Sequence, residues 1–184
     1  MKILVGVTGA SGGYLGLKLA QILYEKGEDC HLIISKNAKI SMQKEGFEFE
    51  KFLEKFKGIL YENDEIWASP ASGSAKFDAM IVAPSSINSL AKITNGIADN
   101  LITRSAAVML KERRKLILAV RESPLSTISL RQMAEISAQG VIIAPMMIGY
   151  YHKPKSLEDM ENFIIGKWLD LLGIENNLFS RWKN

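Results

Sequence analysis

Short runs of apolar residues recur along the chain, and longer stretches with a helical spacing of apolar positions separate them. A run that is apolar throughout is typical of a strand buried on both faces of a parallel sheet. We therefore expect strands at residues 3–7, 31–34, 79–83, 116–120 and 141–144.

The stretches between these runs predict amphipathic helices, because their apolar residues gather on one side of a helix. The apolar stripes occupy residues 15–23, 106–110, 130–136 and 163–172. Gly27, Gly140 and Gly173 follow three of the stripes, at the position where a glycine commonly ends a helix. Alternating strands and helices predict an α/β fold with a parallel sheet and helices on both faces.

Two segments do not follow this alternation. Residues 43–63 are mostly polar, and we interpret them as a solvated helix plus a connection. Residues 67–78 contain Pro, Gly and Ser at the density of turns, so they predict a long surface loop before the third strand. Long loops in compact domains often serve binding or catalysis.

Length and composition limit the class of protein. With 184 residues, 47% hydrophobic and 23% charged, the chain fits a single globular domain over residues 1–184. The net charge of +3 is too small to indicate a nucleic-acid partner, and no apolar run is long enough to span a membrane. One cysteine excludes an internal disulfide and the N-terminus lacks a signal-peptide pattern, so we expect a cytoplasmic location.

The sequence lacks the residue patterns of metal sites and of serine hydrolases. His31 and His152 are the only histidines, Cys30 is the only cysteine, and no cluster has the spacing of metal ligands. The G-x-S-x-G pattern of serine hydrolases is absent. We therefore expect no metal site.

Small polar residues follow the predicted strands, at the sheet edge where parallel folds bind ligands. Residues 8–13, 35–37 and 84–89 are rich in Ser, Thr, Gly and Asn and precede predicted helices, whose N-termini offer free N–H groups and a positive dipole end. Arg121 follows the fourth strand and adds a planar donor. These loops predict a site for a phosphorylated, planar ligand. The alternative is that Ser and Asn only cap the helices.

The glycine spacing narrows the choice of nucleotide ligand. Dinucleotide folds use G-x-G-x-x-G and an acidic residue at the end of the second strand, whereas this chain reads TGASGG at 8–13 and ends that strand at Ser35-Lys36. A mononucleotide such as FMN fits better than NAD. Arg104 and Lys111 lie two helical turns apart, so they share a face and would attract a second anion if that face meets the sheet edge.

Longer motifs resemble one known family. They read GVTGASGG at 6–13, YYHKP at 150–154 and LDLLGIENNLFSRW at 169–182, with a long and specific central motif, SGSAKFDAMIVAPSSINSLAKITNGIADNLITRSAAVMLKERRKLILAVRESP, at 72–124. Over nearly its whole length the chain resembles the flavin prenyltransferases, the UbiX family. The resemblance implies a Rossmann-like, three-layer, homo-oligomeric flavoprotein, typically a dodecamer. It also implies that dimethylallyl phosphate donates its dimethylallyl group to N5 and C6 of reduced FMN. The product, prenylated FMN, serves decarboxylases of the UbiD type.

The resemblance also implies roles for individual residues. The FMN-binding set is Gly9, Ala10, Ser11, Ser35, Ser86, Ile87, Asn88, Ser89 and Arg121. The set around the prenyl donor is Glu45, Arg104, Lys111, Tyr151, Lys167 and Trp182. The catalytic set is Ser11, Lys111, Glu122 and Tyr151, with Glu122 as the acid or base beside the flavin. Lys167 stands where the family commonly has arginine, which keeps the charge and loses the bidentate fork.

Three other functions are compatible with parts of the sequence. An FMN-dependent cysteine decarboxylase has a similar sheet-edge loop, but that group uses a catalytic histidine before the third strand, and residues 67–78 contain none. An FMN-dependent aromatic-acid decarboxylase is the second. The third is a carrier that binds FMN without catalysis. The second set of phosphate-binding residues opposes a carrier, because FMN alone would not need it.

Overall fold

The computed structural model describes residues 1–182 as two compact units, Met1–Pro145 and a second that begins at Met146. Among the residues described, no helix is both long enough and apolar enough to cross a membrane.

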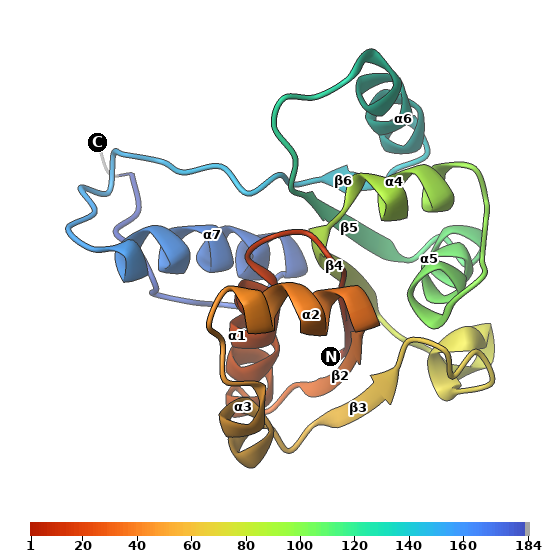
Figure 1. Ribbon diagram of the computed structural model, residues 1–184, viewed down its shortest axis with the longest axis horizontal. Coiled ribbons are helices and arrows are strands. Elements are labelled where there is room, and N and C mark those ends of the chain that lie inside the picture. Colours follow the sequence, from red (N-terminus) through yellow and green to blue (C-terminus); the bar gives the residue numbers. More distant parts are fainter. Residues whose placement is uncertain (183–184) are drawn as a thin grey trace. The chain divides into compact units, whose positions relative to one another are not determined.

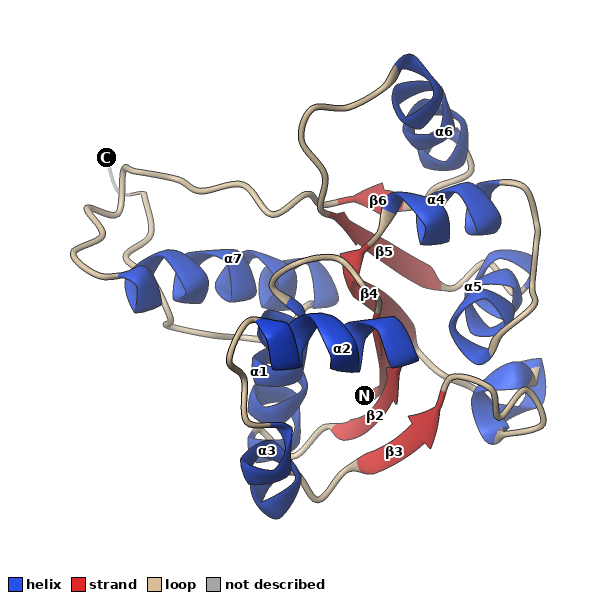
Figure 2. Ribbon diagram, in the orientation of Figure 1, coloured by secondary structure: helices blue, strands red, loops and turns tan. Residues whose placement is uncertain are grey.

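The first unit is built around one parallel sheet of six strands (Figure 2). The strands are β1 Lys2–Val7, β2 Asp29–Ile34, β3 Ile59–Glu62, β4 Ala79–Ser85, β5 Lys115–Val120 and β6 Ile142–Ile143. Their order is β3-β2-β1-β4-β5-β6, and every neighbouring pair is parallel. This is the Rossmann order, in which the chain winds outward in both directions from the space between β1 and β4.

Helices connect the strands (Figure 1). The first unit contains α1 Gly13–Glu25, α2 Lys36–Lys44, α3 Phe49–Lys55, α4 Ile87–Thr94, α5 Leu101–Lys111 and α6 Thr127–Ala138, with short 3-10 helices at Ser69–Ala71 and Gly73–Ala75. The second unit contains α7 Leu157–Leu172. The described glycines at the predicted helix ends confirm those ends: Gly27 and Gly173 have φ of 82° and 85°, the left-handed conformation that glycine adopts without steric cost.

Neighbouring residues of β1 show how the two faces of the sheet are covered. Val7 points to α1, because a Cβ added to Gly16 of α1 would lie 2.9 Å from the Val7 Cγ2 atom. Gly6 points to α5, because its added Cβ would lie 3.4 Å from both γ-carbons of Ile102. Helices therefore cover both faces, and the predicted three-layer α/β fold is confirmed (Figure 2).

The predicted strands are present, and β3 is a sixth that the sequence analysis missed. It lies within the polar stretch 43–63, which the structure divides into α3 and an edge strand. Only four residues long and half exposed, β3 lacks the continuous apolar run that marks the central strands. Its partner residues are His31–Ile34 of β2. The predicted surface loop at 67–78 contains the two 3-10 helices.

His31 is buried in β2 and links the edge strand to the sheet. Its Nε2 atom lies 3.1 Å from Asp29 Oδ1, and its Nδ1 atom lies 2.9 Å from the Tyr61 hydroxyl. The Phe77 ring packs edge-on against the imidazole, with ring centroids 4.8 Å apart. Burial lowers the pKa of His31, and the Asp29 carboxylate opposes that shift only in part.

We expect Gly16→Ala to lower the free energy of unfolding by about 2 kcal/mol or more. The new methyl group would overlap the backbone carbonyl oxygen of Ala83, which cannot move without shifting β4. This loss exceeds the roughly 1 kcal/mol that alanine gains over glycine in a helix. Urea unfolding measures the effect, with Gln21→Ala on the partly exposed face of α1 as the control. A Gly16→Ala protein as stable as wild type would contradict this packing.

We expect His31 to make the protein less stable as the pH falls. Its pKa is lowered in the folded protein, so between that value and the ordinary unfolded value of about 6.5 the unfolded chain binds more protons. The free energy of unfolding should therefore fall as the pH drops below about 6.5, and His31→Gln should remove this part of the dependence. Urea titrations of both proteins at several pH values measure it. Parallel pH profiles for the two proteins would count against the assignment.

Candidate functional site

A polar cavity of about 350 Å³ lies at the carboxyl ends of β1 and β4, where the winding of the sheet changes direction. Its lining residues are Thr8, Gly9, Ser35, Asn37, Asn63, Ser86, Asn88, Ser89, Lys92, Asn100 and Ile102. Five of the predicted FMN-binding residues therefore meet in one cavity: Gly9, Ser35, Ser86, Asn88 and Ser89.

Three helices begin at this cavity. Ser35 caps α2 by accepting a hydrogen bond from the Ala38 N–H at 3.1 Å. Ser86 caps α4 in the same way, and Asn100 caps α5 within a capping box. These residues therefore cap helices and also line the cavity. Converging N-termini direct positive dipole ends and N–H groups at one place, as a phosphate site requires.

Thr8 joins the loops that follow β1 and β4. Its hydroxyl donates to the Pro84 carbonyl at 2.8 Å and accepts from the Ser86 N–H at 2.8 Å. The side chain is almost fully buried, at 4% exposure. Thr8 therefore fixes the position of the α4 N-terminus relative to β1.

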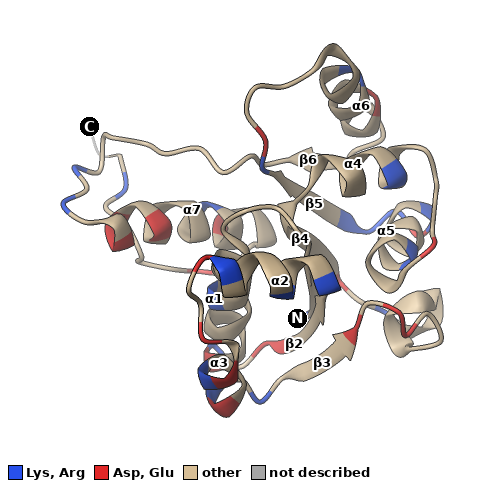
Figure 3. Cartoon of the chain, viewed as in Figure 1, with Lys and Arg blue, Asp and Glu red and all other residues tan. Residues whose placement is uncertain are grey.

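Two lining residues, Asn63 and Lys92, were not expected from the sequence. Asn63 follows β3 directly and accepts two hydrogen bonds from the start of α5: its Oδ1 atom from Ile102 N–H at 3.0 Å, and its carbonyl from Leu101 N–H at 2.8 Å. The sequence would have indicated Asn63 only by its position at the end of a strand, and β3 was not predicted. Lys92 of α4 brings a positive charge to the cavity and pairs with Asp99, whose pKa it lowers. Figure 3 shows a Lys or Arg position on α4.

The glycine-rich loop lies beside the cavity and is held by Glu45. Both carboxylate oxygens of Glu45 accept from the Gly12 N–H, at 3.3 and 3.2 Å. Gly12 itself is the N-cap of α1, in the left-handed conformation, without a side-chain cap. Ser11 is exposed beside it. The structure therefore brings Glu45, predicted near the substrate, to the loop that carries Ala10 and Ser11.

Arg121 and Glu122 follow β5 at the same edge of the sheet. The Arg121 N–H donates to the Ser85 carbonyl at 3.0 Å, which ties this turn to the end of β4. The Glu122 carboxylate accepts from the Ser123 N–H at 3.0 Å. Both side chains are exposed. Ile87, in contrast, begins α4 and packs partly buried against the core.

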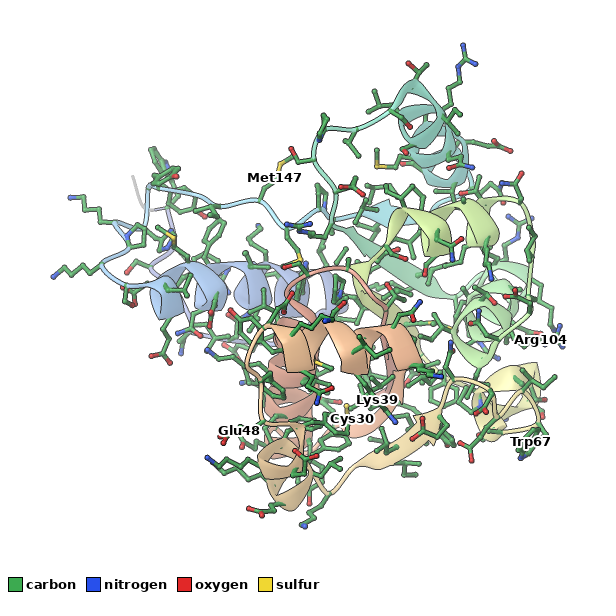
Figure 4. The ribbon with its side chains drawn as sticks, in the orientation of Figure 1. Cys30, Lys39, Glu48, Trp67, Arg104 and Met147 are labelled. Atoms are coloured by element: carbon green, nitrogen blue, oxygen red, sulfur yellow. The ribbon has the colours of Figure 1, made fainter. Side chains whose placement is uncertain are left out.

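Arg104 and Lys111 share a face of α5, but that face meets the 3-10 segment instead of the cavity. The Arg104 Nε donates to the Ala71 carbonyl at 3.2 Å, and Lys111 pairs with Glu112. Neither residue lines the cavity. Figure 4 shows Arg104 at the outer side of α5, on the same side as Trp67. Spacing predicted the shared face and left open which part of the molecule this face meets.

The second unit contains its own cavity, of about 650 Å³. It is lined by Tyr151, His152, Lys153, Asn177, Phe179, Ser180, Arg181 and Trp182. The rings of Tyr151 and Trp182 meet edge to face, with centroids 5.5 Å apart. The structure thus brings together two of the residues predicted at the prenyl donor. Lys167, a third, is exposed on α7 and is not part of this lining.

The described residues offer little support for metal or thiol chemistry. No group of His, Cys, Asp and Glu there is arranged to hold a metal ion. Cys30 is buried in β2, and burial raises the pKa of its thiol to about 12. A thiol with that pKa is a poor nucleophile near neutral pH.

Comparisons with known proteins identify the family of this chain. The sequence profile of the Flavoprotein family matches residues 1–169. The flavin prenyltransferase UbiX of Thermoplasma acidophilum is 46% identical over 182 residues, which cover 99% of this chain and 100% of that protein.

Solved structures give the same result. AnUbiX in complex with FMN and dimethylallyl pyrophosphate superposes with a TM-score of 0.94 at 38% identity, covering 99% of this chain and 97% of that one. A dodecameric FMN-dependent UbiX-like decarboxylase from Escherichia coli O157:H7 also gives 0.94 at 38% identity, with 100% coverage of both chains. The FMN-dependent cysteine decarboxylase TvaF, at 23% identity and a TM-score of 0.62, shares the fold alone. The chain belongs to the UbiX family of flavin prenyltransferases.

Proposed function

We propose that this protein joins a dimethylallyl group from dimethylallyl phosphate to reduced FMN, at N5 and C6, and so produces prenylated FMN. The observation that carries the proposal is the presence of two different sets of side chains. One set surrounds a cavity at three helix N-termini and suits a phosphate. The other combines aromatic and basic residues, which a carrier of FMN alone would not need.

The first cavity fits FMN. Its helix N-termini and hydroxyl groups suit a phosphate dianion, and its volume of about 350 Å³ is in the range of small-molecule sites. Ser35, Ser86 and Ser89 would hold the phosphate end, with Gly9 and Asn88 beside them. Ala10, Ser11 and Ile87 complete the proposed FMN-binding set together with Arg121. When bound, reduced FMN supplies the nucleophilic nitrogen and carbon of the reaction.

The donor needs a different environment. Loss of phosphate from an allylic carbon places negative charge on the leaving oxygens, which fixed cations and hydroxyl donors stabilise. We assign this role to Arg104, Lys111, Tyr151 and Lys167. The Trp182 ring, edge-on to Tyr151, would shield the allyl group from water and stabilise its positive charge.

We assign proton transfer to residues in the loops after β1 and β5. Closing the new ring requires a proton to leave C6, and Glu122 at the end of β5 is the base that we propose. Glu45 holds the Gly12 N–H and thereby orients the loop that carries Ser11. The Ser11 hydroxyl, exposed at the start of α1, is available to both phosphate and flavin.

The proposal includes partners. The dodecameric state of the Escherichia coli O157:H7 relative supports a homo-oligomer, and we propose the dodecamer here as well. A product that is a modified flavin requires a recipient enzyme, for which we propose a decarboxylase of the UbiD type. A direct FMN-dependent decarboxylase is the second candidate, because that relative is described as one.

We expect the protein, incubated with reduced FMN and dimethylallyl phosphate without oxygen, to form a flavin heavier by one dimethylallyl unit. Mass spectrometry of the released flavin measures it, with dimethylallyl pyrophosphate as a second donor in parallel. A decarboxylase would instead release carbon dioxide from an aromatic acid or a cysteine-ended peptide. FMN binding without adduct from either donor would reject prenyl transfer.

We expect Glu122→Gln to bind FMN normally and to slow formation of the finished ring about 10²-fold or more, the usual contribution of a positioned acid or base. The amide keeps the size of the carboxylate and removes its basicity. Rapid-quench mass spectrometry and flavin absorbance follow the reaction, and Glu135→Gln on the exposed side of α6 is the matched control. Normal turnover by Glu122→Gln would show that another group is the base.

A further inference from the structure

The tail after α7, residues 173–182, folds back along its own helix and ends with Trp182 against Tyr151. Trp182 is 75% exposed, and Tyr151 is 41% exposed. A single edge-to-face ring pair contributes only about 0.5–1.5 kcal/mol, so it does not fix an exposed tail by itself. The residues that hold the tail therefore decide where Trp182 lies.

An ion pair holds the tail next to Trp182. The two terminal nitrogens of Arg181 donate to the two carboxylate oxygens of Asp170 at 2.9 and 2.7 Å. The same guanidinium donates to the Asn176 carbonyl at 3.1 Å. A bidentate pair fixes orientation as well as distance, and Trp182 is the next residue along the chain. Asp170 thus orients the backbone that carries the Trp182 ring.

A buried amide holds the start of the tail. Asn176 is 4% exposed, and its Nδ2 atom donates to Asp170 Oδ1 at 2.9 Å, to the Gly166 carbonyl at 3.2 Å and to the Ile174 carbonyl at 3.3 Å. Asp170 therefore accepts from both Asn176 and Arg181. One carboxylate on α7 joins the two ends of the tail.

A gap in the helix surface receives the middle of the tail. A Cβ added to Gly166 would lie 2.6 Å from two ring carbons of Phe179, so only glycine leaves room for this ring. The ring also packs edge-on against Phe163, with centroids 5.0 Å apart, and the Arg181 guanidinium lies over it at 5.2 Å. Phe163 in turn contacts the Tyr151 ring, with centroids 5.5 Å apart.

We propose that Asp170, Asn176 and Gly166 are positioning residues for the prenyl donor, which act by holding Trp182 against Tyr151. None of them was among the site residues expected from the sequence. The inference rests on the proposed function for the role of Trp182 and Tyr151. The attachment of the tail through Asp170 is a separate claim, and it can be tested without measuring enzyme activity.

The test measures donor KM, kcat and FMN affinity for Asp170→Asn. The amide keeps the shape and loses the charge, so we expect donor KM to rise about tenfold, with kcat at saturating donor and FMN affinity within about twofold of wild type. Glu175→Gln removes the same charge from the exposed tail and is the matched control, expected to behave as wild type. Gly166→Ala should raise donor KM similarly without any change of charge, because the methyl group displaces Phe179.

A double variant separates positioning from a general structural effect. If Asp170 acts through Trp182, then Asp170→Asn should add nothing to the donor KM of Trp182→Ala, because the ring that it positions is gone. Additive effects in that background, or a wild-type donor KM for Asp170→Asn, would overturn the inference.

Limited chymotrypsin digestion tests the tail without the reaction. Cleavage at Phe179, identified by mass spectrometry, should be about tenfold faster in Asp170→Asn than in wild type and unchanged in Glu175→Gln. Equal cleavage rates would overturn the attachment of the tail. If wild type forms no prenylated flavin while the digestion result holds, the proposed function fails and the attachment stands.

Discussion

The site in the first unit depends on three helices that begin at one edge of a parallel sheet. All six strands run in the same direction, so the helices that follow β2 and β4 start on the same side. Asn100 at the start of α5 lines the same cavity. Each helix start leaves N–H groups without helical partners, and a dipole end adds to their positive potential. The side chains of Ser35, Ser86 and Asn100 accept hydrogen bonds from some of these N–H groups. The rest is available to an anion, so the fold itself supplies the groups that the proposed phosphate site would use.

Helix packing explains the glycine spacing that distinguished this chain from dinucleotide-binding proteins. A side chain at Gly9 would meet Asn37, and one at Gly13 would meet Met42, both on α2. Gly16 faces the backbone of β4. These glycines let α1 and α2 approach the loop and the sheet closely. Their spacing therefore reflects helix contacts, and the helix N-termini are the groups that we propose for the phosphate.

The sequence predicted the central strands and the loops that line the cavity because both depend on local patterns. Continuous apolar runs mark strands buried on two faces, and small polar residues at their ends mark the binding edge. β3 was not predicted because this edge strand is short and half exposed. Asn63, which follows β3 and lines the cavity, was therefore not predicted either. Arg104 and Lys111 show a different limit. Helical spacing predicted that they share a face, whereas the contact of that face with the 3-10 segment depends on tertiary packing.

The aromatic residues of the second unit were also brought together by tertiary packing that the sequence pattern does not show. Tyr151 and Trp182 are thirty-one positions apart, and no periodic pattern joins them. They meet because Gly173 ends α7 in a left-handed conformation and Asn176 then turns the tail back onto the helix. Phe163 lies between the two segments and contacts both Tyr151 and Phe179. A pair of exposed rings thus depends on a buried amide, a helical glycine and one carboxylate. Only the folded chain shows that these residues lie together.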